Sequence, residues 1–355
     1  MQIAFQMDED GEPACSRAVT PSARVVGKYG MKKTVNRVFP TEATGLIASH
    51  IIGRNYDPWL LCEVPMDTGD EALTYEQFPW YLAMGVKKGV TGEGVGLDKT
   101  WTYCPTLTAG DMPDLATIRY GDNAAVWQTT CAFARQLEIS ASFKGPWNMK
   151  ADVIGRDMKN TYLYKGYGLY GDYPDPYSPY YDMFFETIAY PTPLNTILGQ
   201  TTSFYINTSC EFAATPTKHT GSLIDWTVTI PCFHPKFFQD GELYYTTMGQ
   251  ASRHLALEAT LEFDTELAKH KVWDGWINRT PMYIRLQSVG AMMTGVAVPY
   301  SATIDMVLEI DTFDTLEERD GNDIIKFSAR SVYDVACDVP EWCIYVVNLD
   351  SALPT

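Results

Sequence analysis

Strict alternation of apolar and polar residues constrains this chain more than any other feature of its sequence. The clearest run covers residues 255–263, where every second residue is apolar and glutamate or threonine fills most of the positions between. Successive side chains of a β-strand point to opposite faces, so such a run presents one apolar face to a core. Further runs lie at residues 137–143, 224–230, 282–286 and 304–310. We therefore predict a mainly β fold.

Two short helices are expected between the strands. The first begins with a capping box at Thr74–Gln77 and ends at Gly85, because a threonine followed three residues later by glutamine satisfies free amide groups at a helix start. The second has Asp264 as its N-terminal cap and Gly275 as its terminator, after which the chain returns to a strand.

The elements recur in the same order, which indicates an internal repeat. A chain of 355 residues has room for about two domains. We predict a first domain over residues 1–206 and a second over residues 207–355. In this interpretation residues 59–85 match 254–275, residues 100–104 match 282–286, and residues 136–156 match 304–334.

Two segments are predicted to be long loops rather than core. Residues 86–98 are rich in glycine, and residues 159–190 contain glycine, proline and many tyrosines. So many aromatic residues in a loop are typical of a surface buried against a partner, although they would equally pack on their own domain. The candidates for inter-subunit contact are Tyr167, Tyr170, Tyr173, Tyr177, Tyr180, Tyr181 and, in the C-terminal arm, Leu349.

The charge of the chain disfavours nucleic-acid binding. Its 44 acidic residues against 27 lysines and arginines give a formal charge of -17, which opposes contact with phosphates. No stretch is apolar enough for a membrane helix, and the first ten residues lack the basic start and apolar core of a secretory signal. We expect a soluble protein that is not exported or inserted into a membrane.

The eight cysteines are scattered, without a CxxC pair or the spacing of zinc ligands. Several lie in apolar runs, as Cys62 does, so we expect buried free thiols in a reducing compartment. The cysteines are Cys15, Cys62, Cys104, Cys131, Cys210, Cys232, Cys337 and Cys343.

No catalytic motif stands out. The five histidines are isolated, and Glu93 within the glycine-rich segment 92–96 would repel a phosphate. A glycosidase-type carboxylate pair is the main enzymatic alternative. Acidic residues that alternate along strands are more typical of a solvated sheet face. We expect neither an enzyme nor a bound cofactor or metal.

The order of several stretches resembles the tail tube proteins, or major tail proteins, of bacteriophages with long non-contractile tails. The opening segment and the start of the first helix are similar to those of the family, as is a strand pair that ends in Gly155 and Arg156. The stretches that carry the resemblance are residues 3–13, 73–78, 118–123, 137–143, 149–156, 221–230, 284–290 and 320–327.

The resemblance implies two tandem β-sandwich or half-barrel domains, each with a short flanking helix. Family subunits form rings that stack into a hollow tube, so this chain would be a structural virion protein assembled in the bacterial cytoplasm. Because family rings commonly contain six tube-type domains, two tandem copies imply a trimeric ring, with a hexamer as the alternative. Expected partners are further copies of the chain, a tape-measure protein, a tail terminator and a distal tail protein.

An acidic lumen would let DNA pass without specific binding, because it repels phosphates. Two other functions stay open: a tail protein that stops at one ring, such as a terminator or distal tail protein, and a carbohydrate-binding virion module. The lumen candidates, taken from the polar positions of the long strands, are Glu138, Ser140, Glu258, Glu262, Asp305 and Glu309.

Overall fold

The structure is a computed structural model of the chain. It describes residues 1–6, 22–25, 28–38, 56–68, 72–106, 110–121, 126–156, 158–160, 194–207, 218–237, 245, 247–250, 252, 254–263, 272–314, 317–319, 321–334 and 340–354.

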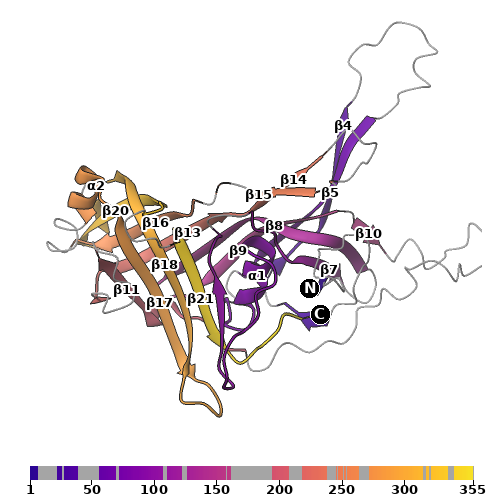
Figure 1. Ribbon diagram of the computed structural model, residues 1–355. Coiled ribbons are helices and arrows are strands. Elements are labelled where there is room, and N and C mark those ends of the chain that lie inside the picture. Colours follow the sequence, from indigo (N-terminus) through magenta and orange to yellow (C-terminus); the bar gives the residue numbers. More distant parts are fainter. Residues whose placement is uncertain are drawn as a thin grey trace, which may run out of the picture.

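The fold is mainly β, as the alternation predicts. Within the described part of the chain, one large antiparallel sheet of 19 strands is accompanied by a separate two-stranded hairpin (Figure 1). In the N-terminal segment the strands are β1 (Gln2–Gln6), β2 (Ala23–Arg24), β3 (Lys28–Tyr29), β4 (Lys32–Val38), β5 (Tyr56–Asp67), β6 (Lys99–Tyr103), β7 (Leu115–Gly121), β8 (Val126–Ser142), β9 (Asn148–Gly155) and β10 (Met158–Asn160). In the C-terminal segment they are β11 (Thr202–Asn207), β12 (Lys218–His219), β13 (Leu223–Pro231), β14 (Phe233–Lys236), β15 (Thr247–Gln250), β16 (Ala256–Glu262), β17 (Met282–Met292), β18 (Pro299–Phe313), β19 (Glu317–Arg319), β20 (Asn322–Ser331) and β21 (Trp342–Asn348).

The same strand pairings occur twice along the chain. In the N-terminal segment β1 pairs with β2 and β7, β7 with β8, β8 with β9, β9 with β5, and β5 with β4. In the C-terminal segment β11 pairs with β12 and β17, β17 with β18, β18 with β20, β20 with β16, and β16 with β13. Each strand of the first set therefore has a counterpart in the second.

One of the predicted matches between the two copies of the internal repeat is wrong. We expected residues 100–104 to correspond to residues 282–286, which lie in β17. The pairings give the counterpart role to β7, because β7 joins β1 to β8 as β17 joins β11 to β18. Residues 100–104 fall in and just after β6, which pairs with β21 instead.

The two segments meet where β8 pairs with β13. The register runs from Gln136 opposite Pro231 to Ser142 opposite Asp225, so the sheet continues from one segment into the other. A single cluster of buried apolar side chains also draws on both segments. The division into domains at residues 206 and 207 stays a prediction.

The first helix is shorter than expected. Helix α1 (Phe78–Gly85) follows a turn in which the Thr74 hydroxyl accepts a hydrogen bond from the Gln77 amide, at 3.3 Å. Among the described residues, the second helix is α2 (Trp273–Asn278), and its predicted start at Asp264 lies outside them. Gly275 lies inside α2 instead of ending it, and the left-handed Arg279 follows the last turn.

A disulfide joins Cys104 to Cys343, which corrects the expectation that these cysteines are free thiols. The two residues become neighbours because β6 pairs with β21, a contact between distant parts of the sequence. Cys62, Cys131 and Cys232 are buried free thiols, as expected. The remaining cysteines lie outside the described residues.

The two ends of the chain lie close together, and the hairpin of β4 and β5 projects from the body (Figure 1). The Phe5 amide donates a hydrogen bond to the Pro354 carbonyl, at 2.7 Å. The last residues of the chain are therefore held against β1, the first strand.

Candidate assembly surface on the sheet

One face of the sheet carries polar side chains from both segments, and we call it the polar face. It is defined by two rows of residues that lie directly opposite one another on successive strands β9, β8, β13, β16, β20 and β18. The first row is Lys150, Glu138, Thr229, Ala256, Arg330 and Glu309. The second row is Asn148, Ser140, Thr227, Glu258, Ser328 and Thr312.

The opposite side of the same strands is apolar and buried. Leu137, Val228 and Leu257 alternate with residues of the polar face and are at most 1% exposed. This apolar side fixes the register, because a slip by one residue would turn the whole buried set of a strand toward water.

Ion pairs connect strands across the polar face. The Lys150 amine lies 2.9 Å from the Glu138 carboxylate, which raises the pKa of Lys150. Other pairs join Arg135 to Asp152 at 2.8 Å, Arg319 to Asp225 at 2.6 Å, and Lys326 to Glu317. Because the first three pairs are largely exposed, each contributes only about 0–1 kcal/mol to stability.

Five of the six predicted lumen residues lie on this face. Glu138 and Ser140 come from β8, Glu258 and Glu262 from β16, and Glu309 from β18. Glu258 and Glu262 are exposed, and neither they nor Glu309 form an ion pair with another described residue. The structure thus gathers acidic side chains from both segments on one surface. Whether that surface lines a lumen stays a prediction.

Asp305 is placed differently from the other five. Its carboxylate is buried and accepts hydrogen bonds from Arg285 Nε and Nη2, at 2.6 and 2.7 Å. Alternation along residues 304–310 placed it on a solvated face. In β18, however, every residue from Ala302 to Leu308 is buried, and the strand becomes exposed only toward its end.

Of the predicted inter-subunit residues, the structure describes only Leu349. The six tyrosines of segment 166–181 lie outside the described residues. Leu349 is partly buried and packs against the core of its own chain. In the glycine-rich loop 86–98, Val95 is fully exposed and the Leu97 side chain is 60% exposed.

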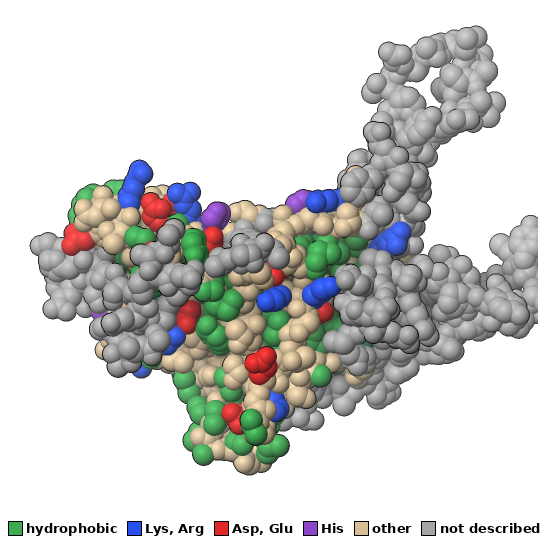
Figure 2. Space-filling view, in the orientation of Figure 1, with side chains coloured by type: hydrophobic (Ala, Val, Ile, Leu, Met, Phe, Trp, Pro, Cys, Tyr) green, Lys and Arg blue, Asp and Glu red, His purple; other side chains and the backbone are tan. Residues whose placement is uncertain are grey.

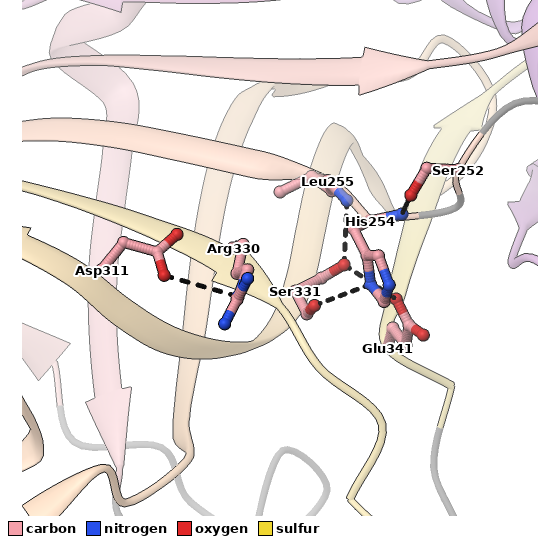
Figure 3. Close-up of polar contacts among 7 residues, drawn as sticks. All are labelled: Ser252, His254, Leu255, Asp311, Arg330, Ser331 and Glu341. Atoms are coloured by element: carbon pink, nitrogen blue, oxygen red, sulfur yellow. Dashed lines mark hydrogen bonds and ion pairs between the residues drawn. The ribbon is translucent and has the colours of Figure 1, made fainter.

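A second polar cluster, which sequence reasoning missed, lies where β20 ends and β21 begins (Figure 3). His254 Nδ1 lies 3.1 Å from both the Glu341 carboxylate and the Ser331 carbonyl oxygen. The Ser331 hydroxyl donates to Glu341 at 2.9 Å and accepts from the Leu255 amide at 2.8 Å. Since the serine hydroxyl donates to a carboxylate and not to an imidazole, the cluster braces strand ends and does not form a nucleophile and base.

Charged and apolar side chains are mixed on the surface seen in Figure 2. Figure 2 shows lysine, arginine and acidic side chains together at the upper left, over α2 and β20, and hydrophobic side chains at the lower tip.

Within the described ranges, no group of three or more histidine, cysteine, aspartate or glutamate side chains could hold a metal ion. Neither described helix is long and apolar enough to cross a membrane.

The sequence matches no known protein-family model and no curated protein.

Proposed function

We propose that this protein is a structural subunit that polymerises into stacked rings and forms the hollow tail tube of a bacteriophage with a long non-contractile tail. The observation that carries the proposal is the repeated set of strand pairings, joined side by side through β8 and β13. A chain that continues its own sheet from one copy to the next can continue it into further chains.

Ring closure has a physical reason. An open sheet edge exposes unpaired backbone groups, and closing the sheet into a ring removes every edge. Head-to-tail stacking of such rings then gives a filament without a fixed end. Two copies of the repeat per chain favour three chains per ring over six.

The charge of the polar face supports a passage for DNA. Glu258, Glu262 and Glu309 are not neutralised by ion pairs with described residues. If this face lines the bore, these carboxylates repel the phosphates and the genome slides without binding. The expected partners are a tape-measure protein, a tail terminator and a distal tail protein.

Electron microscopy of the purified protein across a concentration series tests the proposal. Stacked rings around a hollow bore are expected, with three chains in each ring. Six chains per ring would keep the tube and refute the trimer. Compact particles that never stack, even at high concentration, would refute the tube and favour a single-ring tail protein or a carbohydrate-binding module.

A further inference from the structure

The repeated pairings allow residues of one segment to be matched with their counterparts in the other, starting from the two long strands. The long strand of the N-terminal segment, β8, has a register shift between Ala134 and Gln136 where it pairs with β9. Its counterpart β18 has the same irregularity between Ile310 and Thr312 where it pairs with β20. Counting from these two bulges, Glu138 corresponds to Asp314.

Strands β4 and β13, which are counterparts in the two segments, can be aligned in the same way. From Phe133, one residue before the β8 bulge, the pairing leads through Ile154 and Glu63 to Lys32. From Glu309, one residue before the β18 bulge, it leads through Arg330 and Ala256 to Thr229. Lys32 therefore corresponds to Thr229.

Thr229 and Glu138 lie directly opposite each other where the two segments join. Of their counterparts, Lys32 lies in β4 and Asp314 directly follows β18, and at these positions neither strand has such a neighbour among the described residues. Strands β3 and β4 pair only with β5 there, and the end of β18 pairs only with β20. The single chain thus contains one junction of this kind, between β8 and β13. The counterparts of these two strands, β18 and β4, do not pair with each other within the chain.

The charges of these two edges are complementary. The β3 and β4 edge carries two exposed lysines, Lys28 and Lys32. The opposite edge, from the end of β18 to β19, carries four exposed acidic residues and one exposed arginine, Arg319. The acidic residues are Asp311, Asp314, Glu317 and Glu318, of which Asp311 and Glu317 form ion pairs with Arg330 and Lys326 of the same chain. In a chain of strongly negative charge, two neighbouring lysines that meet an edge rich in carboxylates favour one specific pairing.

The two helices differ in a way that fits the same inference. All residues of α1 are buried, and Gly85 at its end lies against Leu137 of β8 and against Cys232, just after β13. In α2 only Gly275 is buried, although Phe313, the counterpart of Leu137, contacts its tryptophans. Trp273 is 41% exposed and Ile277 is 57% exposed.

We propose that β3 and β4 of one chain add antiparallel to the edge of β18 and β19 of a second copy, with Lys32 opposite Asp314. The incoming strands reproduce the junction of β8 and β13 and cover the exposed face of α2. This proposal rests on the proposed self-assembly, and it specifies which edges close the ring and in which register.

Cysteine cross-linking tests the register. Lys32→Cys and Asp314→Cys are made as separate variants, because residues directly opposite on antiparallel strands are close enough for a disulfide. After oxidation, an assembled mixture of the two variants is expected to give a covalent dimer, and each variant alone is expected to give none. Cys substitution at exposed Asp323, mixed with Lys32→Cys, is the matched control and should give no dimer.

The outcomes separate this inference from the proposed function. Rings or tubes whose Lys32→Cys and Asp314→Cys chains do not cross-link would refute the edge pairing and leave the tube intact. A chain that stays monomeric at every concentration would refute both proposals, because no second copy would then meet the edge. A charge reversal gives a second readout: Asp314→Lys should weaken assembly at least about tenfold, and adding Lys32→Asp should restore it.

Discussion

Asp305 and Arg285 face each other across β17 and β18 and share two short hydrogen bonds through one carboxylate. Both oxygens of Asp305 accept from the guanidinium, and both side chains are largely removed from water, at 9% and 21% exposure. The hydrogen bonds that Arg285 donates to Asp305, together with the negative charge of that carboxylate, raise the pKa of Arg285 above its ordinary value, although burial opposes the shift. The pair therefore fixes two core strands in one register.

Removing one partner of this pair should destabilise the fold strongly. Asp305→Ala leaves a mostly buried guanidinium without its carboxylate, and we expect a loss of about 3 kcal/mol in the free energy of unfolding. Denaturant unfolding of the dilute protein measures it. The matched control is Asp152→Ala, which breaks the exposed pair with Arg135 and should cost less than about 1 kcal/mol. Equal losses in the two variants would contradict the structural role of Asp305.

Asp114 should make stability depend on pH. Burial raises the pKa of its carboxyl from the ordinary 3.8 to about 6, although it accepts hydrogen bonds from the Gly89 amide. The folded state then binds this proton more tightly than the unfolded state, so stability falls as pH rises between about 4 and 6. Above pH 6 its contribution is constant.

Asp114→Asn should flatten that part of the pH profile and should not destabilise the protein at pH 7. The amide oxygen can still accept from Gly89, and no buried charge remains. Unfolding midpoints measured from pH 4 to pH 7 test this expectation, with Asp323→Asn at an exposed position as the control. The expectation would be contradicted if the stability of Asp114→Asn fell over this pH range as steeply as the stability of the wild type and of Asp323→Asn.

The disulfide between Cys104 and Cys343 should add to stability. It closes a loop of 239 residues, and constraints on long loops remove many unfolded conformations. Replacing both cysteines by serine should lower the free energy of unfolding by about 2–4 kcal/mol. Peptide mapping after thiol alkylation without reductant should find these two cysteines unlabelled. Labelling at both positions would show that the disulfide does not form.

Local patterns in the sequence predicted the strands well, because each alternating run lies in or overlaps a strand. The run 304–310 lacks the expected polar side, since β18 is buried from Ala302 to Leu308. The run 255–263 became β16, and Glu258 and Glu262 lie on the polar face. The threonine of the capping box at Thr74 accepts the expected amide hydrogen bond. These features depend on neighbours in the chain, so one sequence is enough to predict them.

Contacts between distant residues were missed because no local pattern encodes them. The disulfide requires β6 to lie beside β21, and the buried state of Asp305 requires β18 to be covered along its first half. The cluster of His254, Ser331 and Glu341 likewise brings together three separate stretches of chain (Figure 3). The repeat of element order was visible in the sequence, but only the strand pairings identify β7 as the counterpart of β17.

Charge reversal on the polar face tests whether this surface meets DNA in an assembled tube. The double substitution Glu258→Lys and Glu309→Lys replaces exposed or half-exposed carboxylates with amines and should leave the buried side of the strands unchanged. Wild-type tubes should not retain DNA. The variant tubes should retain it, with binding that weakens as salt rises, because each phosphate contact contributes a slope of about -0.9 in log K against log salt.

The matched control for that experiment is Glu93→Lys, which makes the same charge change in the glycine-rich loop away from the polar face. Retention is measured by co-sedimentation of labelled DNA with tubes at several salt concentrations, after microscopy has shown that each variant still assembles. If the polar face lines the bore, DNA bound by the double variant should lie inside the tube and be protected from nuclease. DNA that binds both variants equally, or that nuclease removes completely, would place the polar face on the outside of the tube and leave the bore to other residues.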